Sequence, residues 1–216
     1  MLESVAPSKL GLSETRLARV SHWLEEQITS QRLAGASVLI GRRGEVGYVG
    51  TAGMADVERA TPFAEDTIVR IFSMTKPITS VAAMMLYEQG CFQLDDPVAK
   101  YLPEFAETKV WKGEGHGLAD VESQRSPMLI KHLLTHTSGL TYGFMNSNVV
   151  DEAYRARDLE FSGNRAALAQ CVEELASVPL VCQPGSQWNY SVSIDVLGRL
   201  VEIWSGQTLA KFFNDH

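Results

Sequence analysis

The chain has 216 residues, of which 45% are hydrophobic and 21% charged, and its formal net charge is −7. This balance is typical of a globular protein that buries a core, and the length allows one large domain or two small ones. The acidic charge, without a lysine and arginine cluster, argues against a nucleic-acid partner. No stretch approaches the roughly 20 apolar residues that span a bilayer. The first residues also lack the basic and apolar parts of a signal peptide.

The three cysteines, Cys91, Cys171 and Cys182, are odd in number and follow no disulfide or metal spacing. They are typical of reduced side chains in a protein of the cytoplasm, where disulfides are rare. We therefore expect a cytoplasmic protein without a metal ion or other cofactor.

The first third of the sequence alternates a helical pattern with strand patterns. Residues 14–31 carry apolar side chains at helical spacing behind Ser13, a good N-cap. The expected elements that follow are a strand at 36–40, a turn at 42–45, a strand at 46–51, a loop at 53–66 and a strand at 67–72. We expect residues 1–72 to form a region of one helix and several strands.

The remainder, 73–216, is predicted to be mainly helical. A helix that begins at Ser73 and ends before Gly90 should bury one apolar stripe. That stripe consists of Ile78, Val81, Ala82, Met85 and Leu86. Further helices are expected at 130–134, 149–157, 164–176, 192–205 and 209–216, and a surface loop at 105–127. The fold class is therefore α+β.

The stretch Ser73-Met74-Thr75-Lys76 carries the strongest chemical signal. Residues three apart on a helix share one face, so the Ser73 hydroxyl and the Lys76 amine can come within hydrogen-bond reach. A serine hydroxyl is a poor nucleophile until a neighbour accepts its proton, and serine hydrolases that acylate themselves use this spacing. Taken alone, Ser73 is simply a helix cap and Lys76 a solvated lysine.

Several motifs occur in the order found in the serine β-lactamase-like superfamily, over almost the whole chain. They are Ser73–Thr79 (SMTKPIT), Leu94–Val98 (LDDPV), His132–Leu140 (HLLTHTSGL), Pro184-Gly185 with Tyr190-Ser191, and Leu197-Gly198 with Val201-Glu202. The chain most resembles the branch that holds class C β-lactamases, family VIII carboxylesterases and related acyltransferases. The resemblance implies a β-lactamase/penicillin-binding-protein-like fold, with a helical region and part of an antiparallel sheet that is incomplete in this chain.

The resemblance also assigns roles to three residues. It implies that Ser73 is the nucleophile, that Lys76 helps to take its proton, and that Tyr190 acts with Lys76 as base and later protonates the leaving group. Free tyrosine has a pKa near 10, so Tyr190 needs a nearby ammonium to act as base. A helix N-terminus at Ser73 would favour the developing negative charge.

The sequence departs from the lactam-cleaving members of the superfamily in two ways. Those enzymes usually carry asparagine two residues after the tyrosine, and here Val192 stands there, which favours simple esters over lactams. They also carry a third motif whose backbone N–H completes the oxyanion hole, and nothing in 1–216 matches it. We therefore expect the chain to be the N-terminal part of a longer enzyme that needs a C-terminal segment, and to be nearly inactive alone.

Two other candidate sites have simpler interpretations. His132 and His136 are spaced like zinc ligands on a helix, but Leu133 replaces the glutamate of such a motif and no third ligand is evident, so structural roles are expected. Asp95 and Asp96 precede a proline, where capping a turn is the expected role. No Gly-x-Ser-x-Gly elbow of an α/β-hydrolase occurs.

The leading hypothesis is a serine hydrolase that cleaves small carboxylic esters through an acyl-enzyme on Ser73. Within the same chemistry, β-lactamase, D-alanyl peptidase and transesterase activities stay open. A non-catalytic binding module that keeps the fold is the alternative from another class. The expected partner is a small ester, not a membrane or nucleic acid.

Overall fold

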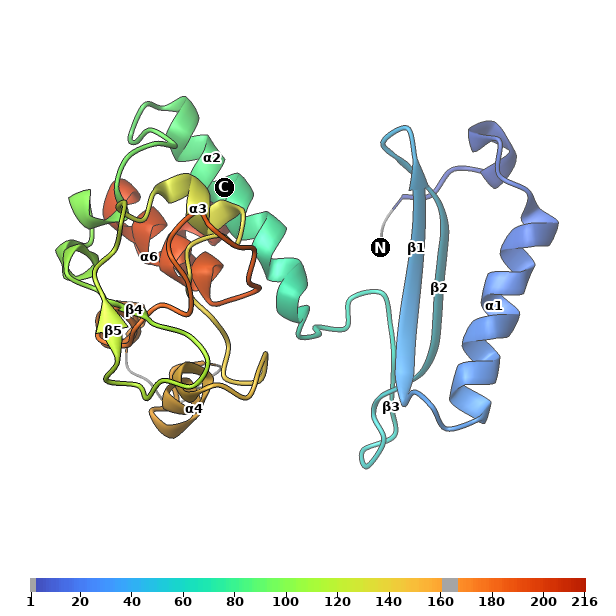
Figure 1. Ribbon diagram of the computed structural model, residues 1–216. Coiled ribbons are helices and arrows are strands. Elements are labelled where there is room, and N and C mark those ends of the chain that lie inside the picture. Colours follow the sequence, from blue (N-terminus) through green and yellow to red (C-terminus); the bar gives the residue numbers. More distant parts are fainter. Residues whose placement is uncertain (1–2, 161–166) are drawn as a thin grey trace. The chain divides into compact units, whose positions relative to one another are not determined.

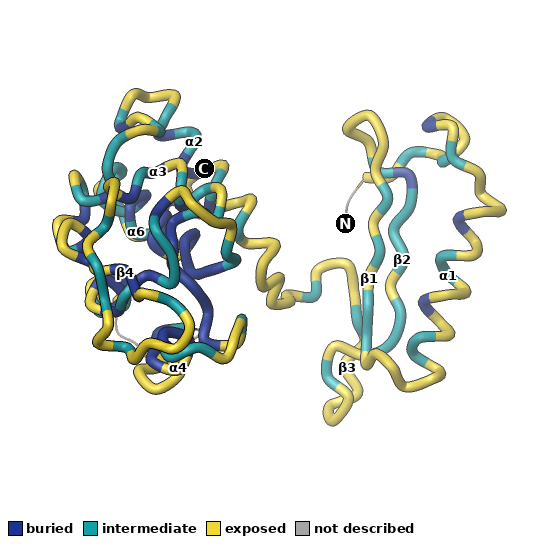
Figure 2. The backbone as a smooth tube through the Cα atoms, viewed as in Figure 1, coloured by how far each residue is buried: buried dark blue, intermediate teal, exposed yellow. Residues whose placement is uncertain are grey.

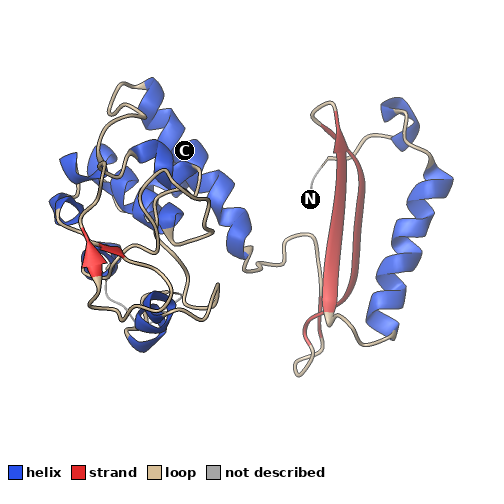
Figure 3. Ribbon diagram, viewed as in Figure 1, coloured by secondary structure: helices blue, strands red, loops and turns tan. Residues whose placement is uncertain are grey.

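The computed structural model describes residues 3–160 and 167–216. The chain divides into two compact units, Met1–Arg70 and Ile71–His216, called unit 1 and unit 2 below. Figure 3 shows the contrast in their secondary structure: unit 1 pairs one long helix with a hairpin, whereas unit 2 is mainly helical.

Unit 1 is built on a long antiparallel hairpin covered by helix α1 (Figure 1). Helix α1 spans Glu14–Thr29, and the Ser13 hydroxyl caps it by accepting a hydrogen bond from the Arg16 amide. Strands β1 (Gly35–Arg42) and β2 (Glu45–Asp56) pair from Gly35↔Gly53 to Arg42↔Glu45, with one irregularity at Ile40/Gly41. The predicted cap, helix and hairpin are thus confirmed.

The segment after the hairpin differs from the prediction. Strand β2 continues to Asp56 and pairs with the short strand β3 (Thr61–Pro62), inside the expected loop at 53–66. The expected strand at 67–72 is wrong, since none of the described strands pairs with it and Ile68 is 99% exposed. Its apolar residues resemble a strand in sequence, but a strand also needs a hydrogen-bonding neighbour.

Unit 2 contains the remaining helices of the described chain. They are α2 (Thr75–Glu88), α3 (Ile130–Leu134), α4 (Val149–Ala156), α5 (Leu168–Ala176), α6 (Ser193–Ser205) and α7 (Leu209–Asp215). Short 3₁₀ turns lie at Pro7–Leu10 in unit 1 and at Phe72–Met74, Val98–Lys100 and Pro103–Ala106 in unit 2. The predicted helices are confirmed with shifts of a few residues, and the start predicted for α5, at 164–166, lies outside the described residues.

The core of unit 2 surrounds α6, which packs against α2, α3, α5 and α7. The dark, buried parts of the tube in Figure 2 gather around this helix. Helix α2 turns Thr79, Ala82, Ala83 and Leu86 inward. The predicted stripe is therefore partly wrong, because the small side chains face the core while Ile78 and Val81 lie exposed.

The expected surface loop at 105–127 also contains paired and buried residues. Strands β4 (Val110–Trp111) and β5 (Val121–Glu122) are antiparallel, and Val110 bridges to Leu180. The side chains of Val110 and Trp111 are buried. The loop interpretation was wrong here because the pairing partner of β4 on one side lies about 70 residues away in sequence, a contact that local composition does not encode.

Two further features of the described chain concern its helices and its cysteines. Among the described helices, none combines the length and the apolar character needed to cross a membrane. Cys91, Cys171 and Cys182 are all free and half-buried.

Candidate active site

Ser73 lies where the chain enters α2. Phe72, just before it, has a φ of 45°, in the left-handed region that non-glycine residues seldom occupy. Ser73 then lies in the 3₁₀ turn Phe72–Met74, one turn ahead of α2, and its side chain is exposed. Strain of this kind persists where the surrounding structure holds it, often at functional sites. Ser73 makes no cap hydrogen bond to α2, so the cap interpretation does not describe it.

Lys76 follows in the first turn of α2 and directs its amine back to the serine. The Lys76 Nζ donates a hydrogen bond to the Ser73 Oγ over 3.4 Å. The same ammonium lies 4.7 Å from the ring centre of Tyr190 and 5.4 Å from that of Tyr142. The spacing of three residues therefore brings the two groups together, as expected from the helix.

Tyr190 reaches the same point from a segment 117 residues away. Its hydroxyl donates a hydrogen bond to the Ser73 Oγ over 2.5 Å. The neighbouring Asn189 fixes this segment, because its amide donates to the His136 carbonyl and its side chain to the Leu140 carbonyl, each over 2.8 Å. The structure thus brings Ser73, Lys76 and Tyr190 within hydrogen-bond reach of one another.

A glycine holds the loop before α4 close to the segment that contains Val181 and Cys182. Gly139 has a φ of +87°, and a Cβ there would lie 2.4 Å from the Cys182 carbonyl oxygen. The Gly139 carbonyl in turn accepts a hydrogen bond from the Val181 amide over 2.8 Å. A buried hydroxyl contact between Ser138 and Ser193, at 2.7 Å, ties the same loop to the start of α6. Any larger residue at 139 would separate these segments.

The charges at the centre favour a tyrosinate beside an ammonium. Desolvation alone would raise the pKa of Tyr190, but its hydrogen bonds with Lys76 and Ser73 and the Lys76 charge outweigh it, so the pKa falls below its usual 10.0. For Lys76, desolvation would lower the pKa, yet hydrogen bonds to Tyr142 and Tyr190 raise it above 10.5. The proton therefore belongs preferentially on Lys76 rather than on Tyr190.

Tyr142 is a member of this centre that the sequence reasoning missed. Its buried ring lies 5.4 Å from the ring of Tyr190 and hydrogen-bonds Lys76 through its hydroxyl. Desolvation raises the pKa of Tyr142, so it stays a neutral phenol. The sequence feature that could have identified Tyr142 is its place two residues after the Gly139-Leu140 motif. An aromatic residue at that place does not indicate that it contacts Lys76.

The two histidines take separate roles. The Nδ1 atom of His132 accepts a hydrogen bond from the Leu129 amide over 3.2 Å and so closes the start of α3. His136 lies beyond α3 and packs its ring 4.8 Å from that of Tyr190. Among residues 3–160 and 167–216, no group of three or more His, Cys, Asp or Glu side chains is placed to hold a metal ion.

The two aspartates make separate polar contacts. Asp96 accepts hydrogen bonds from the Tyr101 hydroxyl, the Gln93 amide and the Lys100 amine over 2.7–2.9 Å. These bonds lower its pKa to about 2. Asp95 forms an ion pair with Lys131 at 2.6 Å.

With this geometry in view, comparison with known proteins gives the family. The family described as Beta-lactamase matches residues 20–216. The chain therefore belongs to the serine β-lactamase and penicillin-binding-protein-like family, as its motifs and α+β fold indicated.

Individual relatives show which members of that family the chain resembles. The chain is 37% identical over 215 residues to Esterase EstB of Burkholderia gladioli, covering 96% of this chain and 50% of that protein. It is 29% identical to monacolin J acid methylbutanoyltransferase of Aspergillus terreus, covering 88% and 46%. The solved structure of EstCE1, a hydrolase with promiscuous acyltransferase activity, matches with a TM-score of 0.78 at 34% identity, covering 92% and 49%. The chain spans about half the length of the relatives it matches.

Proposed function

We propose that this chain carries the acylation centre of a serine hydrolase that cleaves small carboxylic esters. The observation that supports it best is the 2.5 Å hydrogen bond between the Tyr190 hydroxyl and the Ser73 Oγ, with Lys76 beside both. The esterases among the relatives support the same class of reaction.

The proposed acylation uses Tyr190 as the base. Ser73 Oγ attacks the ester carbonyl carbon while its proton passes to the Tyr190 phenolate, which the Lys76 ammonium stabilises. The tetrahedral intermediate then collapses: the bond from carbon to the alcohol oxygen breaks, and Tyr190 returns the proton to the leaving alkoxide. Water repeats the sequence in reverse to release the acid. The oxyanion formed in each step needs backbone N–H donors to stabilise its charge.

This assignment predicts a particular pH dependence. The rate should rise with pH as Tyr190 loses its proton, with a limb below the 10.0 of free tyrosine. It should fall again only above 10.5, where Lys76 becomes neutral. If Lys76 were the base instead, the rising limb would follow the lysine and lie above 10.5.

Val192 supports esters as substrates in preference to lactams. Its buried, apolar side chain stands two residues after Tyr190 and offers no hydrogen bond to an amide. A short-chain nitrophenyl ester should therefore be hydrolysed faster than a chromogenic cephalosporin. The reverse order would favour the β-lactamase or D-alanyl peptidase alternative.

Acyl transfer to an alcohol is a second candidate. The methylbutanoyltransferase and the hydrolase with promiscuous acyltransferase activity are both described as acyl-transferring proteins. An acyl-enzyme on Ser73 would give either outcome, depending on whether water or an alcohol attacks it. Added alcohol should then yield a new ester at the expense of free acid.

Labelling with a fluorophosphonate tests the nucleophile without requiring turnover. Because the chain is expected to be nearly inactive without a C-terminal segment, the labelling uses the enzyme with that segment present. Its wild type should carry one adduct, on the peptide that contains Ser73, and Ser73→Ala should carry none. Ser126→Ala removes another exposed serine and is the matched control, which should label like wild type. An unlabelled wild-type enzyme, or a label elsewhere, would contradict the proposal and leave the non-catalytic binding module as the better interpretation.

A further inference from the structure

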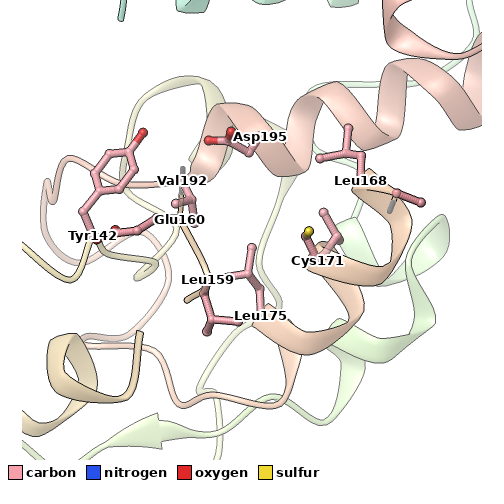
Figure 4. A pocket seen from close by; sticks show the side chains of 10 residues that line it. Tyr142, Leu159, Glu160, Leu168, Cys171, Leu175, Val192 and Asp195 are labelled. Atoms are coloured by element: carbon pink, nitrogen blue, oxygen red, sulfur yellow. The ribbon is translucent and has the colours of Figure 1, made fainter. Parts of the chain in front are cut away.

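Unit 2 contains a cavity of about 300 Å³, and Figure 4 shows the side chains that line it. Tyr142 forms part of its wall and contacts Lys76 through its ring and hydroxyl, so the cavity adjoins the acylation centre. Its volume is at the lower end of the range of small-molecule sites. A group attached to the ester carbonyl on Ser73 would have this space available.

Most of the cavity wall is apolar, whereas one end carries carboxylates. The apolar part of the wall comes from the segment after α4, from α5 and from the residue that precedes α6. These residues are Leu159, Leu168, Cys171, Val172, Leu175 and Val192. In Figure 4, Asp195 and the hydroxyl of Tyr142 lie toward one end and Leu159 and Leu175 toward the other. The catalytic end is therefore the polar one.

Asp195 is the carboxylate of this cavity without a side-chain partner among the described residues. Within the described part of the chain, no side chain hydrogen-bonds or ion-pairs with its carboxylate, which accepts only from its own amide. The residue is exposed to solvent in part, and desolvation by the surrounding protein raises the pKa of its carboxylate. A carboxylate held in such surroundings without a donor gains most from a ligand that supplies one.

The second carboxylate of the cavity already has partners. Glu160 accepts a hydrogen bond from the Gly143 amide over 2.8 Å, and the Arg155 charge acts on it as well. Lys76 acts on Asp195 from the catalytic side, but in the proposed mechanism its charge is balanced by the Tyr190 phenolate. Asp195 is therefore the carboxylate left to bind a cation.

We propose that this cavity binds an aliphatic group with an ammonium at its catalytic end, so that the enzyme prefers esters of α-amino acids with apolar side chains. The ammonium would face Asp195 close to the ester carbonyl, and the side chain would extend toward Leu159 and Leu175. This specificity rests on the proposed hydrolase function, but the binding of the group does not require turnover.

A titration with two matched probes tests the binding. Isoamylammonium and isoamyl alcohol have the same carbon skeleton and differ in the ammonium, and their dissociation constants follow from chemical-shift changes of the ¹⁵N-labelled chain. The ammonium should bind about tenfold more tightly, as a charge-assisted hydrogen bond predicts. Asp195→Asn should abolish this preference, whereas Glu107→Gln, an exposed carboxylate of the same unit, should keep it. Equal binding of the two probes, no binding of either, or a preference that survives Asp195→Asn would overturn the proposal.

A second variant locates the bound probe and keeps the test decisive if Asp195→Asn does not fold. Leu168→Trp fills part of the cavity without touching the carboxylate, so it should weaken both probes. Ammonium binding of wild-type strength in this variant would place the probe elsewhere and contradict the proposal. Circular dichroism checks that each variant is folded.

The kinetic counterpart compares leucine methyl ester with methyl 4-methylpentanoate, which lacks only the amine. The ratio of their kcat/KM values should fall about tenfold from wild type to Asp195→Asn, and intrinsic ester reactivity cancels in this comparison. An unchanged ratio would overturn the specificity. If Ser73 is labelled by the fluorophosphonate but the two probes bind equally, only the specificity inference is contradicted. If the ammonium probe binds selectively but Ser73 is not labelled, only the hydrolase proposal is contradicted.

Discussion

The two units of the chain differ in how they bury apolar surface. In the described part of unit 1, the buried hydrophobic side chains are Leu10 of the first 3₁₀ turn and Leu17 and Leu24 of α1. In unit 2 the buried side chains form one continuous cluster around α6. Packing against α1 stabilises the hairpin, but the fewer buried side chains of unit 1 give it less apolar burial than the cluster of unit 2. The candidate catalytic side chains all lie in the unit with the larger core.

Amide hydrogen exchange should show the largest difference between the units. We expect the central amides of α6 to exchange slower than those of β1 and β2 by on the order of a thousandfold, because opening α6 requires disruption of the main core. Exchange followed by NMR or mass spectrometry measures this in the intact chain. Equal protection in both units would mean that they unfold as one body.

Tyr190→Phe should affect the site of unit 2 without affecting its core. Loss of the proposed base should lower kcat/KM for a short-chain ester about a thousandfold, with little change in the melting temperature. Tyr87→Phe, on α2 in the same unit, is the control and should retain activity. A Tyr190→Phe variant with near-normal kcat/KM would assign the base to another group.

A pair of leucine truncations compares the two cores directly. Leu197→Ala removes a fully buried side chain of α6 and should destabilise unit 2 by about 2–5 kcal/mol. Leu24→Ala removes the same atoms from α1, and it should leave the unfolding transition of unit 2 unchanged. Urea unfolding monitored by tryptophan fluorescence separates these outcomes. A shift of the same transition by both variants would show that the units are energetically coupled.

Asp96→Asn should produce the smallest effect, and the difference in stability from wild type should change with pH only in the acid range. The pKa of Asp96 is lowered to about 2 in the folded chain from 3.8, so its contribution to stability is present above pH 3.8 and is lost as the pH falls toward 2. The wild type should therefore lose more stability than Asp96→Asn over this interval. Parallel stability curves would show that the hydrogen bonds to Asp96 contribute little.

The sequence anticipated the elements whose signals are local. Ser13 caps α1, the turn at 42–45 joins β1 and β2, and Gly206 ends α6 with a φ of +69°. The motifs gave the fold class and the family, and the helical spacing gave the approach of Lys76 to Ser73. Each of these depends on residues within a few positions of one another, which a sequence pattern records directly.

Other features depend on which segments pack together. The inward face of α2 is set by close contact with α6 through Thr79, Ala82 and Ala83, and β4 exists because a distant segment lies beside it. The sequence by itself therefore determined the family, the motifs and the serine–lysine spacing. Only the tertiary structure decided that Tyr142 contacts Lys76 and that Asp195 faces an apolar cavity, because such contacts arise from the packing of a whole core rather than from neighbours along the chain.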